Sequence, residues 1–299
     1  MLLLPVAATG AAVEPPAAGS SPPHDPEPLF ATSTLLDRIG RVVAPVMING
    51  TGPYRLIVDT GANSSALSQE LVARLGLIVE LNDTILLNSV TGSTRVPVVR
   101  IAELRTGAVR MTDLRVPVLL TAVAGDTDGI LGVDGFAGRR MEIDFRNDTV
   151  RLVDASRPFR PRGHLILRSR VRFGGLIVVD AHVGRLPIKA VIDTGADRSI
   201  GNILLQRKLG LLNSASRPEQ DAIVMGATEG TMRGQALRTP AIQMGSVRLH
   251  DLEVTFADLP VFSLWNLNQT PALVLGMDVL GTTSEIVVDY RRSQIFMKP

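Results

Sequence analysis

The chain has 299 residues, 45% of them hydrophobic, which is enough for a large buried core and roughly two domains. Its formal net charge is only +2, aromatic residues make up 4%, and no basic stretch is interleaved with aromatic residues, so nucleic-acid binding is disfavoured. Cysteine is absent, which excludes a disulfide framework, a thiolate metal site and a cysteine nucleophile.

Residues 1–33 are expected to hold a signal or anchor remnant followed by a Pro-rich linker. Residues 1–13 have an apolar run followed by small residues, as at the end of a signal peptide, but the usual preceding basic residues are missing. Two alternatives stay open: a cleaved signal, or a retained anchor that associates the N-terminus with a membrane. Residues 14–28, EPPAAGSSPPHDPEP, are typical of an unfolded linker.

From about Thr34 onward the sequence predicts mostly short strands, in which Val, Ile and Leu alternate with other residues. These strands are VVAPVMING, RLIVD, RVPVVRI, VRMTDLRVPVLL, TVRLV, LIVVDAHVG, IKAVID, VRLHDLEVTF and SEIVVDY. Only two helices are predicted. SQELVARLGL has Ser68 as its N-cap and Gly76 as its stop, and NILLQRKLGLL has Asn202 and Gly210 in the same roles.

An internal repeat organises this part of the chain. Its landmarks recur at offsets of 134 residues (Asp59 to Asp193, Gly76 to Gly210), 144 residues (Gly132 to Gly276) and 145 residues (Asp144 to Asp289). The growth in the offset indicates an insertion around PVFSLWNLNQTPA in the second copy. The repeat predicts two homologous lobes, residues 34–155 and 166–299, joined by a linker at residues 156–165.

The sequence Asp-Thr-Gly-Ala occurs once in each lobe, at the same place in the repeat. A single copy is explained as a strand followed by a turn, because Asp and Gly are common turn residues. Two copies in equivalent positions change this interpretation. Each follows an apolar strand, RLIV or KAVI, and each precedes a Ser-containing stretch and a helix. The arrangement favours a joint role for the two aspartates.

On these residues the chain resembles the bacterial retropepsin-like aspartic peptidases that have two lobes in one chain. The resemblance covers about residues 34–299 and implies an all-β, bilobal fold with about one short helix in each lobe. In that class an apolar-apolar-Gly sequence packs beneath each Asp. The matching groups are Asp59-Thr60-Gly61 with Ile130-Leu131-Gly132, and Asp193-Thr194-Gly195 with Val274-Leu275-Gly276.

The resemblance implies an aspartic endopeptidase that hydrolyses peptide bonds with water. Two neighbouring carboxylates cannot both be ionised, so they share one proton, and one acts as base while the other acts as acid. The glycines are expected to let the backbone turn tightly, and the threonines to hydrogen-bond across the lobe interface. The implied catalytic residues are Asp59 and Asp193, supported by Thr60, Gly61, Thr194 and Gly195.

Ala62 and Ala196 follow the two glycines, where pepsin-like enzymes usually have Ser or Thr. A hydroxyl at this position would hydrogen-bond the ionised carboxylate and lower its pKa. Its absence predicts activity that extends to weakly acidic or near-neutral pH.

Two Gly-containing segments at matching positions, residues 88–96 and 224–232, resemble flap hairpins that close over a peptide. The alternative is a pair of ordinary hairpin turns. As flaps, they would contact substrate through Thr91, Gly92, Gly226 and Ala227. The single tryptophan, Trp265, could line a subsite or could pack against the rest of the lobe.

Other chemistries find less support. The four histidines do not have metalloprotease spacing, Asp126 and Asp128 lack the later ligands of a calcium loop, and no serine-hydrolase or P-loop motif is present. No metal and no organic cofactor is implied. The remaining rival is a catalytically inactive relative that binds peptides. The resemblance further implies a protein or peptide substrate, a monomer, and a periplasmic or secreted location.

Overall fold

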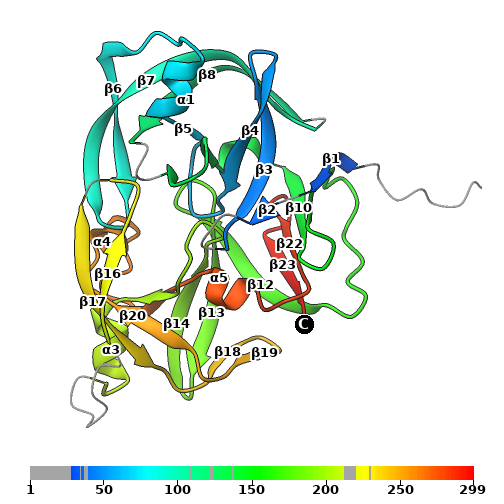
Figure 1. Ribbon diagram of the computed structural model, residues 1–299. Helices are drawn as coiled ribbons and strands as arrows, with labels where there is room; N and C mark the ends of the chain where they lie inside the picture. Colours follow the sequence, from blue (N-terminus) through cyan, green and yellow to red (C-terminus); the bar gives the residue numbers. More distant parts are fainter. Residues whose placement is uncertain are drawn as a thin grey trace, which may run out of the picture.

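The computed structural model describes residues 28–33, 35–36, 40–107, 109–120, 124–136, 138–211, 220–228 and 230–299. Residues 1–27, which include the expected signal or anchor and most of the Pro-rich linker, lie outside the described residues. Strands dominate and form two sheets, in agreement with the predicted all-β, bilobal fold (Figure 1). None of the helices in the described part is long and apolar enough to cross a membrane.

The smaller sheet belongs to the N-terminal half. Its strands are β2 (Leu35–Leu36), β3 (Val42–Ile48), β4 (Thr51–Val58), β5 (Ala66–Ser68), β6 (Glu80–Ser89), β7 (Gly92–Thr106), β8 (Val109–Leu119) and β9 (Gly129–Leu131). They are ordered β2-β3-β4-β9-β5-β8-β7-β6. Helix α1 (Gln69–Arg74) follows β5, and the 3-10 helix η1 (Val133–Gly135) follows β9.

The larger sheet contains the other strands. They are β1 (Pro28–Ser33), β10 (Arg139–Asp144), β11 (Thr149–Asp154), β12 (Leu165–Arg172), β13 (Leu176–Val183), β14 (Leu186–Ile192), β15 (Ile200–Gly201), β16 (Gln220–Met225), β17 (Thr231–Arg238), β18 (Ile242–Met244), β19 (Val247–Leu249), β20 (Glu253–Phe256), β21 (Ala272–Leu275), β22 (Glu285–Asp289) and β23 (Gln294–Lys298). The order is β1-β11-β10-β22-β23-β12-β13-β14-β21-β15-β20-β17-β16, with β18 paired to β13 and β19. The helices here are α3 (Ile203–Lys208), α4 (Pro260–Leu264) and α5 (Met277–Leu280).

The internal repeat of the sequence is also a repeat of strand pairing. In the first lobe β4 pairs in parallel with β9, while β5 pairs antiparallel to β9 and parallel to β8. In the second lobe β14 pairs in parallel with β21, while β15 pairs antiparallel to β21 and parallel to β20. The strands that end at the two Asp-Thr-Gly sequences therefore occupy equivalent places.

The two halves share part of the larger sheet. Strands β1, β11 and β10 come from the N-terminal half, and β22, β23 and β12 continue the same sheet from the C-terminal half. The junction is the antiparallel pair β10–β22, in which Met141 lies opposite Val288. This sheet holds the lobes together by main-chain hydrogen bonds, in addition to the linker between β11 and β12.

Residues 28–33 lie within the segment that was expected to be a linker, but they form a paired strand. They form β1, which pairs antiparallel with β11 from Thr149 to Val153. Without β1, β11 would present an unpaired edge of main-chain donors and acceptors, which proteins commonly cover. The Pro-rich composition that predicted a linker, residues 14–28, ends at the first residue of this edge strand.

Both predicted helices are present with the predicted caps. The Ser68 side chain accepts a hydrogen bond from the N–H three residues later, and the Asn202 side chain does the same for α3. Gly76 and Gly210 follow the helices with φ angles of 61° and 71°, a left-handed conformation that favours glycine. The predicted insertion contributes α4 to the second lobe.

The segment VRLHDLEVTF was predicted as one strand, but it forms two, β19 and β20. Asp251 lies between them with a φ of 53°, and this left-handed residue turns the chain out of the extended conformation. As a result β19 pairs with β18, whereas β20 pairs with β17 and β15.

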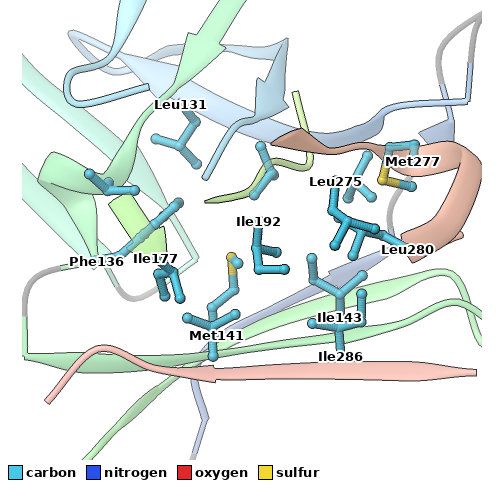
Figure 2. Close-up of a cluster of buried hydrophobic side chains, with 14 of the residues drawn as sticks. Leu131, Phe136, Met141, Ile143, Ile177, Ile192, Leu275, Met277, Leu280 and Ile286 are labelled. Carbon is cyan, nitrogen blue, oxygen red and sulfur yellow. The ribbon is translucent and has the colours of Figure 1, made fainter. Parts of the chain in front are cut away.

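One buried apolar core extends through both lobes and the shared sheet. Figure 2 shows Leu131 from β9 facing Ile192 and Leu275 from the second lobe, with Met141 and Ile286 of the shared sheet below them. Each of these side chains is at most 1% exposed. Burying side chains of this size stabilises by about 1.5–3 kcal/mol each. Val58 and Ile192, which directly precede the two Asp-Thr-Gly sequences, belong to this core, so its packing helps to fix the relative position of the two loops.

Candidate active site

Asp59 and Asp193 occupy equivalent positions, each immediately after the last residue of an inner strand, β4 or β14. The Asp59 main-chain N–H donates to the carbonyl of Leu131, and the Asp193 N–H donates to that of Leu275, both at 3.0 Å. The two apolar-apolar-Gly sequences therefore hold the backbone of the two aspartates. Asp193 is buried, with 8% of its surface exposed, and Asp59 is half-buried.

The two carboxyl groups lie close together across the lobe boundary, and each perturbs the pKa of the other. The Gly61 N–H donates to Asp59 Oδ1 at 2.7 Å, and the Gly195 N–H donates to Asp193 Oδ1 at 2.9 Å. A Cβ atom on Gly61 would lie 2.6 Å from Oδ1 of Asp193, and one on Gly195 would lie 2.6 Å from Oδ1 of Asp59. Each loop thus touches the carboxyl group of the other lobe.

Gly61 and Gly195 were expected to be glycine because the backbone turns tightly there. The structure gives a different physical reason. Neither Gly61 nor Gly195 has a positive φ, so an unusual backbone conformation does not require them. They are required because the opposite carboxyl group occupies the space that a side chain would fill. This approach from the other lobe was not visible in the local sequence.

The two threonines link the loops through their hydroxyl groups. Thr60 Oγ1 donates to the carbonyl of Ile192 at 2.9 Å and accepts from the Thr194 N–H at 3.1 Å. Thr194 Oγ1 donates to the carbonyl of Val58 at 2.7 Å and accepts from the Thr60 N–H at 3.1 Å. Both residues are at most 1% exposed. The four hydrogen bonds cross from one lobe to the other and hold the aspartates in register.

Below this layer is a second symmetric pair of polar contacts. Ser65 Oγ donates to Asp134 Oδ1 at 2.8 Å, and the Ser65 N–H donates to the other carboxylate oxygen at 2.9 Å. Ser199 and Asp278 repeat these contacts at 2.7 Å and 2.9 Å. Each serine hydroxyl also accepts from the N–H of the glycine in the apolar-apolar-Gly sequence, at 3.1 Å and 3.2 Å. These contacts tie each Asp-Thr-Gly loop to the strand beside it.

Sequence reasoning did not single out these four residues as site residues, although a signal was present. Ser65 and Ser199 are 134 residues apart, the same offset as the two aspartates, and Asp134 and Asp278 are 144 residues apart. Each Ser and its Asp therefore recur with the repeat. Burial also raises the pKa of Asp278, although hydrogen bonds from Ser199 oppose this rise.

The surroundings of Asp59 and Asp193 raise the pKa of both carboxyl groups, but by different amounts. Burial raises the pKa of Asp193 well above its ordinary value, and the nearby charge of Asp59 raises it further. Burial also raises the pKa of Asp59, but the Gly61 N–H and the positive charge of Arg41 oppose that rise. The arrangement favours a state in which Asp193 keeps the proton and Asp59 is ionised.

Tyr290 is a further polar group near this pair. Its hydroxyl is buried and has no hydrogen-bond partner among the described residues, and its ring packs against Phe136 at 5.8 Å. Burial and the negative charge of Asp59 raise the pKa of Tyr290, so the phenol stays protonated. Its counterpart in the repeat is Phe145, which has no hydroxyl, and this difference is the only signal that the sequence offers.

The two predicted flaps meet at their tips, as the β6–β7 and β16–β17 hairpins show in Figure 1. The hydroxyl groups of Thr91 and Thr228 are 3.0 Å apart. A Cβ atom on Gly226 would lie 2.8 Å from Thr91 Oγ1, so only glycine leaves room for this contact. Gly92 begins β7 directly after the turn and has a positive φ of 145°, which favours glycine. Ala227 is half-buried and adjoins Thr228 in the chain. Of the four expected flap residues, Thr91 and Gly226 come together.

An apolar cluster of the second lobe continues from the Asp193 loop to the flaps. Its half-buried members are Val90 of the β6–β7 hairpin, Met232 of the β16–β17 hairpin, Phe173 and Ala196. Trp265 belongs to the buried part of the cluster, is 7% exposed, and stacks on Phe173 at a ring distance of 6.3 Å. Of the two alternatives left open for Trp265, the structure shows the packing role.

The family described as Aspartyl protease matches the chain over residues 44–134 and 179–279. Each matched segment contains one Asp-Thr-Gly sequence and one apolar-apolar-Gly sequence, and each spans the repeated strand pairings of one lobe. No curated protein sequence matches the chain.

Proposed function

We propose that this chain, which belongs to the aspartyl protease family, is an endopeptidase that hydrolyses peptide bonds with Asp59 and Asp193. The observation that carries the proposal is the pair of carboxyl groups itself. They come from the two lobes, lie close together, and have pKa values raised by burial. Such a pair can hold one proton between its two carboxyl groups. Because one chain supplies both groups, the proposed active form is a monomer.

The unequal environments suggest a role for each group. Ionised Asp59, favoured by Arg41, would accept a proton from a water molecule as its oxygen attacks the carbonyl carbon of the scissile bond. Protonated Asp193 would donate its proton to the carbonyl oxygen, which gives a tetrahedral diol. The proton now on Asp59 would then pass to the amide nitrogen while the C–N bond breaks. A diol proton would return to Asp193, and the initial protonation state would be restored.

The flaps are proposed to hold the peptide over this pair. An extended peptide can pair with strands as an added strand, and the half-buried Val90 and Met232 would contact its side chains. Because the Thr91 and Thr228 hydroxyls join the flap tips, the tips would have to separate before a polypeptide can bind.

The test is hydrolysis of a diverse peptide mixture by the wild type and by Asp193→Asn. Asparagine keeps the shape but cannot supply the shared proton, so kcat/KM should fall by about 10²- to 10⁴-fold. Asp83→Asn is the matched control, because Asp83 is a half-buried ion-pair partner of the exposed Arg115 on the first lobe, and its activity should stay close to the wild type.

The rival function, peptide binding without cleavage, predicts a different result. The wild type would then leave every peptide intact, and calorimetry would give the same peptide affinity for the wild type and for Asp193→Asn. That pair of results would overturn the proposal. Equal cleavage by the wild type and the variant would show instead that another group performs the hydrolysis.

A further inference from the structure

Basic residues are concentrated in two segments that lie next to each other in the shared sheet. Residues 155–179 and 290–299 contain nine of the 31 Lys and Arg residues and none of the 29 Asp and Glu residues. The rest of the chain has 22 basic against 29 acidic residues. Strand β12 of the first segment pairs with β23 of the second. The net charge of +2 therefore conceals a basic region on an otherwise acidic protein.

Three of these arginines share one side of β12. Arg168, Arg170 and Arg172 alternate with inner residues and are exposed, together with Ile166, which is 48% exposed. Successive side chains of a strand point to opposite sides, so these four point to the same side. Among the described residues, no hydrogen bond or ion pair engages the side chains of Arg168 and Arg172. We call Arg168, Arg170 and Arg172, with Arg291 and Arg292 of the β22–β23 turn, the basic face.

The basic face is hollowed. Arg168, Arg170 and Arg292 line a hollow of about 400 Å³ together with Gln294 and the acidic Asp180. The Asp180 carboxylate is occupied, because Lys189 forms a short ion pair with it and Arg170 lies 3.8 Å away. The hollow therefore keeps an excess of positive charge, to which the unpaired Arg168 contributes most directly.

Arg292 connects the hollow to the linker between the lobes. Its guanidinium donates to the main-chain carbonyls of Ala155 and Ser156, at 2.5 Å and 3.0 Å, and pairs with buried Asp289 at 3.2 Å. These contacts fix the linker, with its exposed Arg157, against the β22–β23 turn. The basic face is thus built on a rigid part of the molecule.

The surroundings favour a partner recognised by charge alone. Nucleic acids are commonly bound with exposed aromatic side chains on which bases stack. The nearby aromatic rings are occupied, because Phe159 packs under Arg140 at 5.2 Å and Phe173 stacks on Trp265. The exposed apolar residue is Ile166. Arginines beside a single aliphatic side chain suit a surface of phosphate groups with hydrocarbon beneath it.

The position of the basic face agrees with such a surface. In Figure 1, β12, β22, β23 and β1 lie on one side of the molecule, and the flap strands β6 and β16 lie on the other. In the sequence, β1 directly follows residues 1–27, which contain the apolar run LLLPVAA. We propose that the basic face binds the phosphate groups of an anionic phospholipid surface, so that the flaps face away from that surface.

The measurement is sedimentation of the full chain with lipid vesicles at about 0.05 M and 0.5 M NaCl. Neutral phosphatidylcholine vesicles are compared with vesicles that contain about 30% phosphatidylglycerol. The wild type should bind the anionic vesicles at low salt and be released at high salt, because exposed charges are screened. Each arginine should contribute about fivefold to the partition coefficient.

The test variant is Arg168→Gln/Arg170→Gln/Arg172→Gln, which should bind the anionic vesicles about 100-fold more weakly. The control is Arg100→Gln/Arg105→Gln/Arg110→Gln. It removes the same charge from exposed strand positions of the first lobe and should bind like the wild type. Thermal unfolding of both variants, with midpoints close to that of the wild type, shows that the fold is retained.

Three results with vesicles would overturn the proposal, and a fourth could come from inorganic phosphate. The first is equal binding of neutral and anionic vesicles, and the second is an equal loss of binding in the two triple variants. The third is tighter binding to a single-stranded oligonucleotide than to the anionic vesicles at the same salt. Inorganic phosphate is a separate arm: if millimolar phosphate protects the wild type from unfolding and the vesicles do not sediment it, the ligand is a small anion. None of these results depends on whether the chain cleaves peptides.

Discussion

Replacing Thr194 by Val would remove the hydroxyl that links the two lobes beside the aspartates while keeping the branched shape of the side chain. Thr194 Oγ1 donates to the Val58 carbonyl at 2.7 Å and accepts from the Thr60 N–H at 3.1 Å. The site is 1% exposed, so water cannot replace the lost hydroxyl without rearrangement. Both main-chain groups of the first lobe would be left buried and unpaired.

The expected loss follows from these two groups. A buried polar group left without a partner costs about 1–3 kcal/mol, so the variant should lose about 2–6 kcal/mol of unfolding free energy. Thr239→Val is a control for the loss of a buried threonine hydroxyl. Thr239 Oγ1 donates to the Leu252 carbonyl, but that carbonyl also accepts from the Thr239 N–H at 2.9 Å. The control should therefore lose only about 0.5–1.5 kcal/mol.

The assay is equilibrium unfolding in urea, followed by the fluorescence of Trp265, the only tryptophan and a buried one. Peptide hydrolysis under native conditions is measured in parallel, because a shift of the loops should reduce kcat even in folded protein. Thr194→Ser keeps the hydroxyl and should stay within about 1 kcal/mol of the wild type.

An unfolding free energy of Thr194→Val equal to that of Thr239→Val, within about 0.5 kcal/mol, would refute the reasoning. So would equal losses in Thr194→Val and Thr194→Ser, because the effect would then come from packing of the methyl group rather than from the hydroxyl.

Three other predictions concern the same region. Asp193→Asn should raise the thermal midpoint at pH 7 by roughly 2–6 °C. Burial raises the pKa of Asp193 in the folded state, so the wild type loses stability as the pH rises from the unfolded value of 3.8 through the folded pKa. The rise in the thermal midpoint should vanish at pH 3, where Asp193 is protonated in both states. A rise that persists at pH 3 would show that burial of the ionised carboxylate is not its cause. Ala62→Ser/Ala196→Ser should move the acidic limb of the pH–rate profile down by about 1–2 pH units, because an added hydroxyl stabilises the ionised carboxylate; an unchanged limb would count against the role of the two alanines. Gly226→Ala should push the flap tips apart and lower kcat/KM roughly tenfold with little change in the unfolding midpoint, which steady-state kinetics and calorimetry would check.

Local features of the fold were predictable because they depend on neighbouring residues. The caps Ser68 and Asn202 bond N–H groups three residues away, and the glycines after both helices have the left-handed conformation that their position predicted. Where local chemistry was misjudged, the error was also local. Asp251, in a left-handed conformation, divides a strand that alternation alone had predicted to be continuous.

The position of the candidate site was predictable for a different reason, which is the duplication. Any residue that recurs with the repeat must occupy equivalent places in two similar lobes, and this applies to Asp59 and Asp193. The same reasoning would have found Ser65 with Asp134, and Ser199 with Asp278, but the serines and their aspartates were not considered together. A repeat says which positions are equivalent, and it does not say which residues touch.

The sequence by itself determined the two lobes, the strands that end at Asp-Thr-Gly, and the types of residue present at the candidate site. Only the tertiary structure decided that Gly61 contacts Asp193, that Thr60 and Thr194 bridge the lobes, and that β10 pairs with β22 to join the halves. It also paired β12 with β23 and so brought together two distant segments that contain nine basic residues. These contacts join residues more than 100 positions apart. Their formation depends on how the apolar faces of both lobes pack together, which no local pattern of residues specifies.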